Sequence, residues 1–262
     1  MIRCSGLWHS YGTRPTLRGV DLHVQPGELL CVMGPNGMGK STLLGIIGGV
    51  LSPIEGTVTI DGRTRRGSVE DETHIRQRAV YLPDQPWLPI ERTGRQWLVA
   101  VGRLYGVDPR RLFDRVEQLL EVFDLAGQGD ADIGSYSTGQ RKKIGLCGAL
   151  ITAAPVLILD EPMSGGLDAS ALLAVEQILT HLAQQQDTTV LMAVPVPELV
   201  DRIAHRVAVI HQGQILTVGT PTELCQQTSQ TTLARALDHL THPGGHDAVQ
   251  RYLTAQDRGD GV

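Results

Sequence analysis

The chain has 262 residues, a length that suits one large domain or two small ones. Hydrophobic residues make up 41% and charged residues 19%, which is typical of a folded chain rather than a disordered one. The formal net charge of -5 argues against a general nucleic-acid binder, because phosphate contacts need clustered Lys and Arg. Aromatic residues are only 4%, so the core is expected to rest on aliphatic side chains.

Neither a disulfide framework nor a membrane span is expected. Four cysteines are scattered without a CxxC pair, at Cys4, Cys31, Cys147 and Cys225, and are interpreted as reduced thiols of a cytosolic protein. The first residues lack a signal-peptide pattern. The longest uncharged stretch, 144–159, is shorter than the roughly 20 residues of a spanning helix and contains Pro155. It is better explained as a helix followed by a buried strand.

The N-terminal part alternates between strand and loop patterns. Residues 17–24 alternate as in a half-buried strand, and 28–33 form a short apolar run typical of a buried one. A glycine-rich loop follows, and a helix is predicted from about Lys40 to Gly48. Residues 57–60 predict another strand that enters a tight turn.

Helical and strand patterns alternate in the second half. Residues 110–125 predict a helix with an apolar face made of Leu112, Phe113, Val116, Leu119, Leu120 and Phe123. Residues 156–159 and 189–194 predict buried parallel strands, separated by a helix over about 169–185. This alternation predicts a doubly wound α/β core. The end, from about residue 241, is expected to fray.

One segment carries a strong phosphate-binding signal. It matches G-x-x-x-x-G-K-[ST] after a predicted strand and consists of Gly34, Pro35, Asn36, Gly37, Met38, Gly39, Lys40, Ser41 and Thr42. Glycines allow successive N–H groups to point at phosphate oxygens, and the following helix presents its positive end. Lys40 would reach the outer phosphates, and the Ser41 hydroxyl would ligate Mg²⁺. The loop is predicted to bind a nucleoside triphosphate.

Two adjacent carboxylates, Asp160 and Glu161, follow the predicted strand over 156–159. In open α/β sheets this end of a strand is where ligands bind. Asp160 is expected to hold Mg²⁺ through water, and Glu161 to act as general base toward the attacking water. Alone, such a pair is as easily a polar turn, but the upstream loop favours the catalytic interpretation.

Together these motifs resemble the ABC (ATP-binding cassette) ATPase family over roughly residues 1–220. The segment Tyr136–Gln140 is similar to the family signature, with Thr138 at a position usually held by glycine. The resemblance implies a head-to-tail dimer in which Ser137, Gly139 and Gln140 of one subunit face the γ-phosphate held by the other. Without the resemblance, Ser137 would be interpreted as a helix cap.

The resemblance assigns further site residues. Tyr11 lies where the family places an aromatic that stacks on adenine, although without the resemblance it is simply a packed or exposed tyrosine. The family usually has a metal-sensing glutamine directly after Pro83. Here Asp84 takes that position and Gln85 follows, so either side chain is a candidate metal ligand.

Two departures from the family pattern bear on mechanism. The expected γ-phosphate histidine is replaced by Pro195, which has no side-chain donor, so hydrolysis is expected to be slow or to depend on another group. His205 and His211 are interpreted as ordinary surface histidines. The second departure is an extra glycine in the loop before Asp168, at Gly165–Gly166, which adds backbone freedom. Asp168 is expected to keep the family's role at the dimer interface.

The implied fold is α/β, with a P-loop NTPase core around a parallel sheet, an N-terminal antiparallel β subdomain and an inserted helical subdomain. The ATPase domain would span 1–220, with its core in 1–84 and 151–220 and its helical subdomain in 85–150. A C-terminal helical extension and flexible tail would occupy 221–262. ATP and Mg²⁺ are the implied cofactors.

The implied function is that of an ATP-hydrolysing motor subunit of an ABC transporter, as a homodimer or heterodimer beneath a separate permease at the inner face of the membrane. Segments 81–86, 93–95 and 104–107 resemble exporter-type cassettes. An alternative is a low-turnover, ATP-gated clamp paired with a more active subunit. Ribosome- or DNA-acting relatives fit poorly, because they carry two cassettes or a long coiled coil. A GTPase is disfavoured because no Asn-Lys-x-Asp motif occurs.

Overall fold

An antiparallel sheet begins the chain in the computed structural model, which describes residues 1–242. Its strand order is β2-β1-β4-β5. These strands are β1 (Ile2–Tyr11), β2 (Arg14–Val24), β4 (Glu55–Ile60) and β5 (Arg63–Thr64). Alternate side chains of β1 and β2 are buried, so one face of this sheet packs on the interior.

A larger, mostly parallel sheet forms the centre of the molecule, in the order β10-β9-β3-β8-β7-β6. Its strands are β3 (Leu29–Met33), β6 (Ala79–Leu82), β7 (Val156–Asp160), β8 (Thr189–Ala193), β9 (Arg206–His211) and β10 (Gln214–Gly219). Every residue of β3, β7 and β8 is buried, as expected for strands covered on both faces. The two sheets and the helical insert confirm the predicted fold class.

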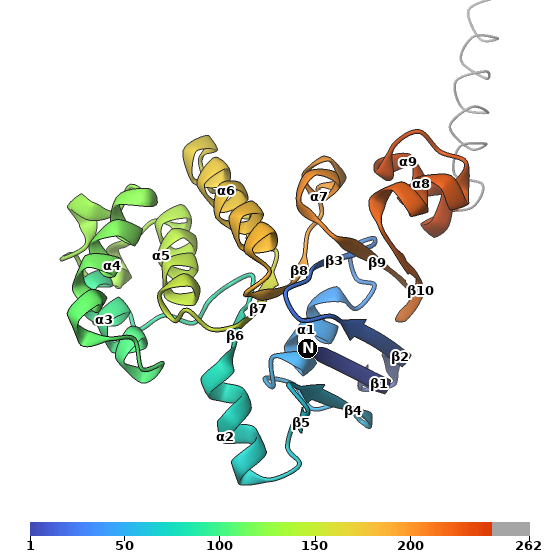
Figure 1. Ribbon diagram of the computed structural model, residues 1–262, viewed down its shortest axis with the longest axis horizontal. Helices are drawn as coiled ribbons and strands as arrows, with labels where there is room; N and C mark the ends of the chain where they lie inside the picture. Colours follow the sequence, from blue (N-terminus) through green and yellow to red (C-terminus); the bar gives the residue numbers. More distant parts are fainter. Residues whose placement is uncertain (243–262) are drawn as a thin grey trace, which may run out of the picture.

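Helices cover both faces of the large sheet (Figure 1). They are α1 (Lys40–Ile47), α2 (Val69–Arg78), α3 (Gly94–Leu104), α4 (Pro109–Val122), α5 (Thr138–Ile151), α6 (Ala169–Gln185), α7 (Pro197–Ile203), α8 (Pro221–Thr228) and α9 (Leu233–Thr241), with short 3-10 turns η1 (Ala126–Gln128) and η2 (Ile133–Ser135). Helix α1 packs between the two sheets in one apolar cluster. Helices α3, α4 and α5 lie together at one end of the molecule.

Helix α4 shows how its sequence sets its packing. Pro109 starts it, and the Asp108 side chain accepts from the Arg110 N–H at its N-cap. Leu112, Val116 and Leu120 are buried against the core. Phe113 was predicted to share this face, but that prediction is wrong: 55% of Phe113 is exposed. Adjacent helix positions diverge by about 100°, so Leu112 and Phe113 cannot both face the core.

The two phenylalanines of the chain provide a matched test of this packing. Phe123, the C-cap residue of α4, is 1% exposed. Phe123→Ala is expected to lower the free energy of unfolding by about 3–5 kcal/mol, because it leaves a cavity in the core. Phe113→Ala should cost less than about 1 kcal/mol. Urea unfolding of both variants measures the difference, and equal losses would contradict the assignment of Phe123 to the core.

Within residues 1–242, none of the helices is both long and apolar enough to cross a bilayer. The uncharged stretch 144–159 forms the end of α5 and strand β7, as predicted. All four cysteines are free, and burial raises the pKa of the Cys4 thiol to about 12. The predicted flexible tail falls after His242, outside the residues that the structure describes.

Candidate functional site

The glycine-rich loop connects the end of β3 to the start of α1, and its glycines serve different purposes. A Cβ atom at Gly34 would collide with the Ile210 carbonyl, and one at Gly39 would come within 2.8 Å of the Thr16 carbonyl oxygen. Both residues have positive φ, 155° and 103°. Gly37 has nothing within 4 Å of its would-be Cβ. The protein itself therefore requires Gly34 and Gly39, whereas Gly37 borders open space.

Lys40 is the first residue of α1 and lies at the bottom of this loop. It is 5% exposed, and its Nζ donates to the carbonyls of Gly34 at 2.8 Å and Pro35 at 3.1 Å. Burial lowers the pKa of Lys40, while the charges of Glu161 and Asp160 act in the opposite direction. The N-cap of α1 has no side-chain hydrogen bond, so the helix N-terminus remains available to an anion.

A concavity of about 540 Å³ opens above the loop. It is lined by Tyr11, Arg14 and Thr16 from β1 and β2, by Asn36, Gly37, Gly39, Lys40, Ser41 and Thr42, and by Glu161. Tyr11 is 57% exposed, and its ring lies at a steep angle to that of His9, with the two ring centres 4.9 Å apart. Sequence reasoning missed Arg14 and Thr16. The available signal was the position of Arg14 opposite Tyr11 across a tight hairpin.

Ser41 and Asp160 meet at the edge of the concavity. The Ser41 hydroxyl donates to Oδ1 of Asp160 at 3.1 Å, across 119 residues of sequence. Burial raises the pKa of Asp160, with the charges of Glu161 and Asp84 adding to it and the Ser41 hydrogen bond opposing it. A hydroxyl and a buried carboxylate are hard oxygen donors that suit Mg²⁺, and a cation would stabilise the ionised form of Asp160. This pair therefore fits the predicted metal site.

Glu161 has an unusual backbone conformation. Its φ is 47°, in the left-handed region that costs a non-glycine residue free energy. The Glu161 N–H donates to the Ala193 carbonyl at 3.0 Å, which fixes the turn against the end of β8. The strand ends thus place the Glu161 side chain on the lining of the concavity.

The two candidate metal sensors after β6 differ sharply. Asp84 receives Lys142 Nζ at 2.7 Å and the Ser164 hydroxyl at 2.9 Å on the same oxygen. These hydrogen bonds lower the pKa of Asp84 against the raising effect of burial. Gln85 is exposed and does not line the concavity. Of the two residues, Asp84 is therefore the one whose side chain bonds to other segments, namely α5 through Lys142 and the loop after β7 through Ser164.

The signature segment lies outside the concavity of its own chain. Ser137 is the N-cap of α5 and forms a reciprocal capping box with Gln140. Gly139, in the first turn, approaches the Gly166 carbonyl too closely to accept a Cβ without a shift. Asp168 caps α6 and pairs with Lys143 at 2.5 Å. The role of these residues toward a second subunit stays a prediction.

Pro195 follows β8 and is exposed. His205 was expected to be an ordinary surface histidine, but its Nδ1 accepts the Leu29 N–H at 2.9 Å, so it supports the start of β3. His211 is half-buried at the end of β9, next to His242.

The family model described as "ABC transporter" matches residues 17–164. The chain is 36% identical over 227 residues to "Daunorubicin resistance ATP-binding protein DrrA3" of Streptomyces coeruleorubidus, covering 87% of this chain and 70% of the relative. It is 34% identical to "Nod factor export ATP-binding protein I" of Paraburkholderia xenovorans, covering 82% and 69%. A match at 28% identity, "Fe(3+) ions import ATP-binding protein FbpC" of Vibrio cholerae, has import in its name; it covers 90% of this chain and 66% of the relative.

Among solved structures, the fold is similar to the "Dimeric Structure of MJ0796, a Bacterial ABC Transporter Cassette". The TM-score is 0.76 at 24% identity, with 84% of this chain and 98% of that chain covered. At this identity the likeness supports the fold alone.

Proposed function

Because the chain belongs to the ABC transporter family of ATP-binding proteins, we propose that it is the motor subunit of an exporter. ATP binding would close a dimer of such subunits, and hydrolysis would reopen it. The motion would drive a separate membrane-embedded permease, so the chain would lie at the inner face of the membrane through that partner.

The observation that carries the proposal is the single concavity shared by the phosphate loop and Glu161. Lys40 and the free N-terminus of α1 can bind the phosphates, once the Lys40 ammonium leaves the two loop carbonyls. Ser41 and Asp160 would hold Mg²⁺, which when bound neutralises charge on the phosphates. Glu161 would accept the proton of the attacking water.

A second subunit would complete this site. In the described residues, nothing from the signature segment lines the concavity. Ser137 and its neighbours at the start of α5 are exposed or half-buried, as a surface that meets a γ-phosphate in another chain must be. A homodimer and a heterodimer both satisfy this arrangement.

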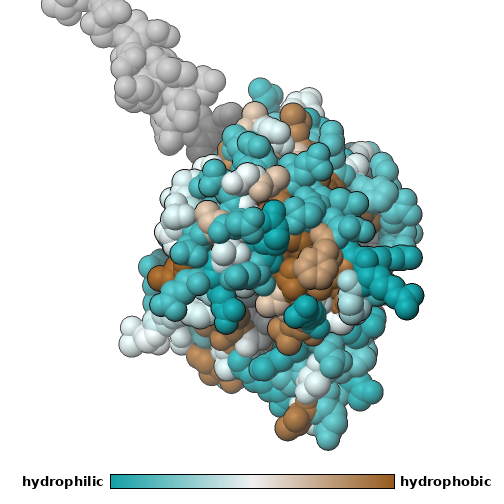
Figure 2. Space-filling view, turned by 90° about the vertical axis from the view of Figure 1, so that its left-hand side faces the viewer, coloured by the Kyte–Doolittle hydropathy of each residue, from teal (hydrophilic) through white to brown (hydrophobic). Residues whose placement is uncertain are grey.

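The permease would dock over residues 85–105. Three apolar side chains in this range are largely exposed: Trp87 at 89%, Leu104 at 79% and Ile90 at 59%. Single exposed apolar residues are common, but three within 18 positions of one segment favour an interface. Figure 2 looks onto the side where helices α3, α4 and α5 lie, and brown apolar side chains interrupt its hydrophilic surface. Relatives named for drug resistance and for export favour the export direction.

The residue at position 195 is expected to limit the rate of ATP hydrolysis. Because proline offers no donor to the γ-phosphate, Pro195→His is expected to raise turnover about tenfold or more. The measurement is phosphate release from Mg²⁺-ATP at saturating ATP. Unchanged turnover would show that position 195 does not limit hydrolysis.

The function itself is tested by Mg²⁺-dependent phosphate release from the purified wild-type chain, alone and mixed with membranes that hold the permease. Turnover with ATP supports the motor. ATP binding without turnover under both conditions would overturn it and favour the alternative, an ATP-gated clamp paired with a more active subunit, which Pro195 also suits.

A further inference from the structure

Two consecutive lysines on α5, Lys142 and Lys143, are buried and pair with carboxylates of two different loops, Asp84 and Asp168, which are 43% and 56% exposed. The lysine side chains are 5% and 9% exposed. Lysine is almost never so buried unless it is paired. Adjacent residues on a helix diverge by about 100°, so the two ammonium groups reach different partners. We call these residues the lysine pair.

Lys142 joins three segments. Its Nζ donates to Oδ1 of Asp84 at 2.7 Å and to the Asp84 carbonyl at 2.8 Å, after β6. The Ser164 hydroxyl shares the same Asp84 oxygen at 2.9 Å and lies 3.4 Å from the lysine. Ser164 in turn donates its backbone N–H to the Glu161 carbonyl at 3.1 Å, and its hydroxyl oxygen, whose single proton can go to either acceptor, lies 3.0 Å from the same carbonyl. A continuous chain of hydrogen bonds thus connects α5 to Glu161.

Lys143 holds the other end of the same loop, residues 161–168. It pairs with Oδ2 of Asp168, whose Oδ1 accepts the Ala171 N–H as the cap of α6. Between these anchors lie Gly165 and Gly166, both with positive φ, 75° and 90°. The middle of the loop therefore has the freedom to change shape while its two ends are held by the lysine pair.

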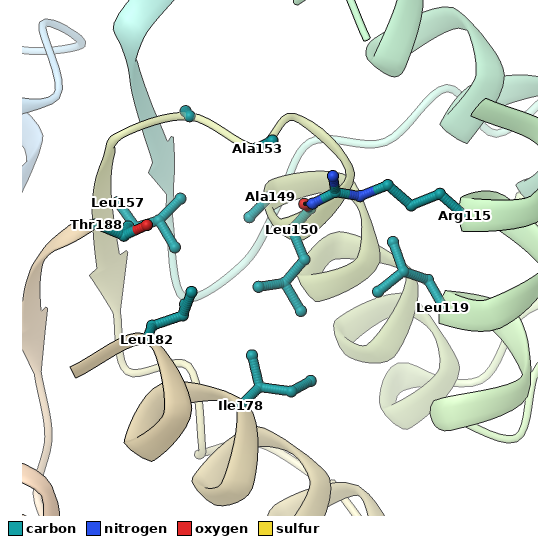
Figure 3. A pocket seen from close by; sticks show the side chains of 10 residues that line it. Arg115, Leu119, Ala149, Leu150, Ala153, Leu157, Ile178, Leu182 and Thr188 are labelled. Atoms are coloured by element: carbon teal, nitrogen blue, oxygen red, sulfur yellow. Dashed lines mark hydrogen bonds between the residues drawn. The ribbon is translucent and has the colours of Figure 1, made fainter. Parts of the chain in front are cut away.

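The apolar contact between α5 and α6 is interrupted near the C-terminal end of α5. Near the C-terminal end of α5, an apolar crevice of about 190 Å³ separates Leu150 from Ile178 and Leu182 of α6 (Figure 3). The Arg115 guanidinium of α4 donates to the Leu150 carbonyl of α5 at 2.9 Å, so it joins α4 to α5 rather than to α6. The contact of α5 with α6 is thus incomplete at this end, and Lys143 connects α5 to the N-cap of α6 at the other.

A buried ammonium group is costly unless it is paired, so the partner of each buried lysine is held beside α5. We propose that Lys142 is a positioning residue: through Asp84 and Ser164 it holds the 161–168 loop and thereby the backbone of Glu161, whereas Lys143 anchors only the loop's far end. The consequence for ATP turnover rests on the proposed function. The positioning itself does not.

The test compares two neighbouring variants of the full chain without nucleotide, Lys142→Met and Lys143→Met, by hydrogen–deuterium exchange. Lys142→Met is expected to speed amide exchange about tenfold in residues 83–90 and 161–166, because both segments lose their shared anchor. Lys143→Met should speed exchange in 166–170 and leave 83–90 unchanged. Equal effects of the two variants on 83–90, or no effect of Lys142→Met there, would overturn the proposal.

A double-variant cycle and an ATPase assay complete the test. Asp84→Asn combined with Lys142→Met should add little to the exchange seen with Lys142→Met alone, since both break one network. Lys142→Met should lower kcat about tenfold while ATP affinity stays within about twofold, because it displaces Glu161 and not the phosphate loop. A matching loss of affinity would contradict positioning. Absence of turnover in the wild type would count against the proposed function, and exchange would still report the anchor.

Discussion

Glu161→Gln is expected to abolish steady-state ATP hydrolysis and to leave ATP binding intact. A positioned general base contributes about 10²–10⁴ in rate, and the amide cannot accept the proton of the attacking water. Glutamine keeps the size of the side chain, and the Glu161 N–H to Ala193 bond is a backbone interaction, so the turn should persist. Phosphate release and equilibrium binding of a fluorescent ATP analogue measure the two effects separately.

Dimer formation gives this variant a second readout. With hydrolysis blocked, ATP and Mg²⁺ should accumulate the closed dimer, visible as a doubling of mass in light scattering. Glu55→Gln, which alters a carboxylate on β4 outside the concavity, is the matched control and should behave as wild type. Residual turnover of Glu161→Gln close to that of the wild type would remove Glu161 from the role of base.

Lys40→Met is expected to weaken ATP binding by about 10–150-fold, the loss associated with a hydrogen bond to a charged group. The same change should not destabilise the fold. In the absence of ATP, Lys40 is buried and bonded only to two loop carbonyls, and its charge carries a desolvation cost that methionine lacks. Binding is measured by titration with ATP, and stability by thermal unfolding without nucleotide.

Arg14→Met is the informative companion, because Arg14 also lines the concavity but lies on its exposed rim. A smaller loss of affinity than for Lys40→Met is expected, since exposed charges act through water. If Lys40→Met binds ATP as tightly as the wild type, the phosphate loop is not the nucleotide site. If it unfolds far more easily, Lys40 instead supports the fold.

Much of the fold could be predicted from local patterns in the sequence. Fully apolar runs predicted β3, β7 and β8 to within a residue, because strands buried on both faces leave no polar alternation. The phosphate loop followed from its glycines and from its place between a strand and a helix. The error at Phe113 has a local cause as well. Phe113 follows Leu112 by about 100° around α4, which takes it off the face that Leu112, Val116 and Leu120 bury.

By itself the sequence determined several of the strands and helices, among them β3, α1, α4, β7, α6 and β8, and it indicated which residues are candidates for nucleotide chemistry, because both depend on short-range spacing. Only the tertiary structure decided what those residues meet. Gly34 is confined by Ile210, Arg14 joins the concavity, and Asp84 pairs with Lys142, 58 positions away. These contacts depend on the spatial order of the strands in the large sheet, where β3 lies between β8 and β9. That order results from burial summed over the whole chain, which no local period records.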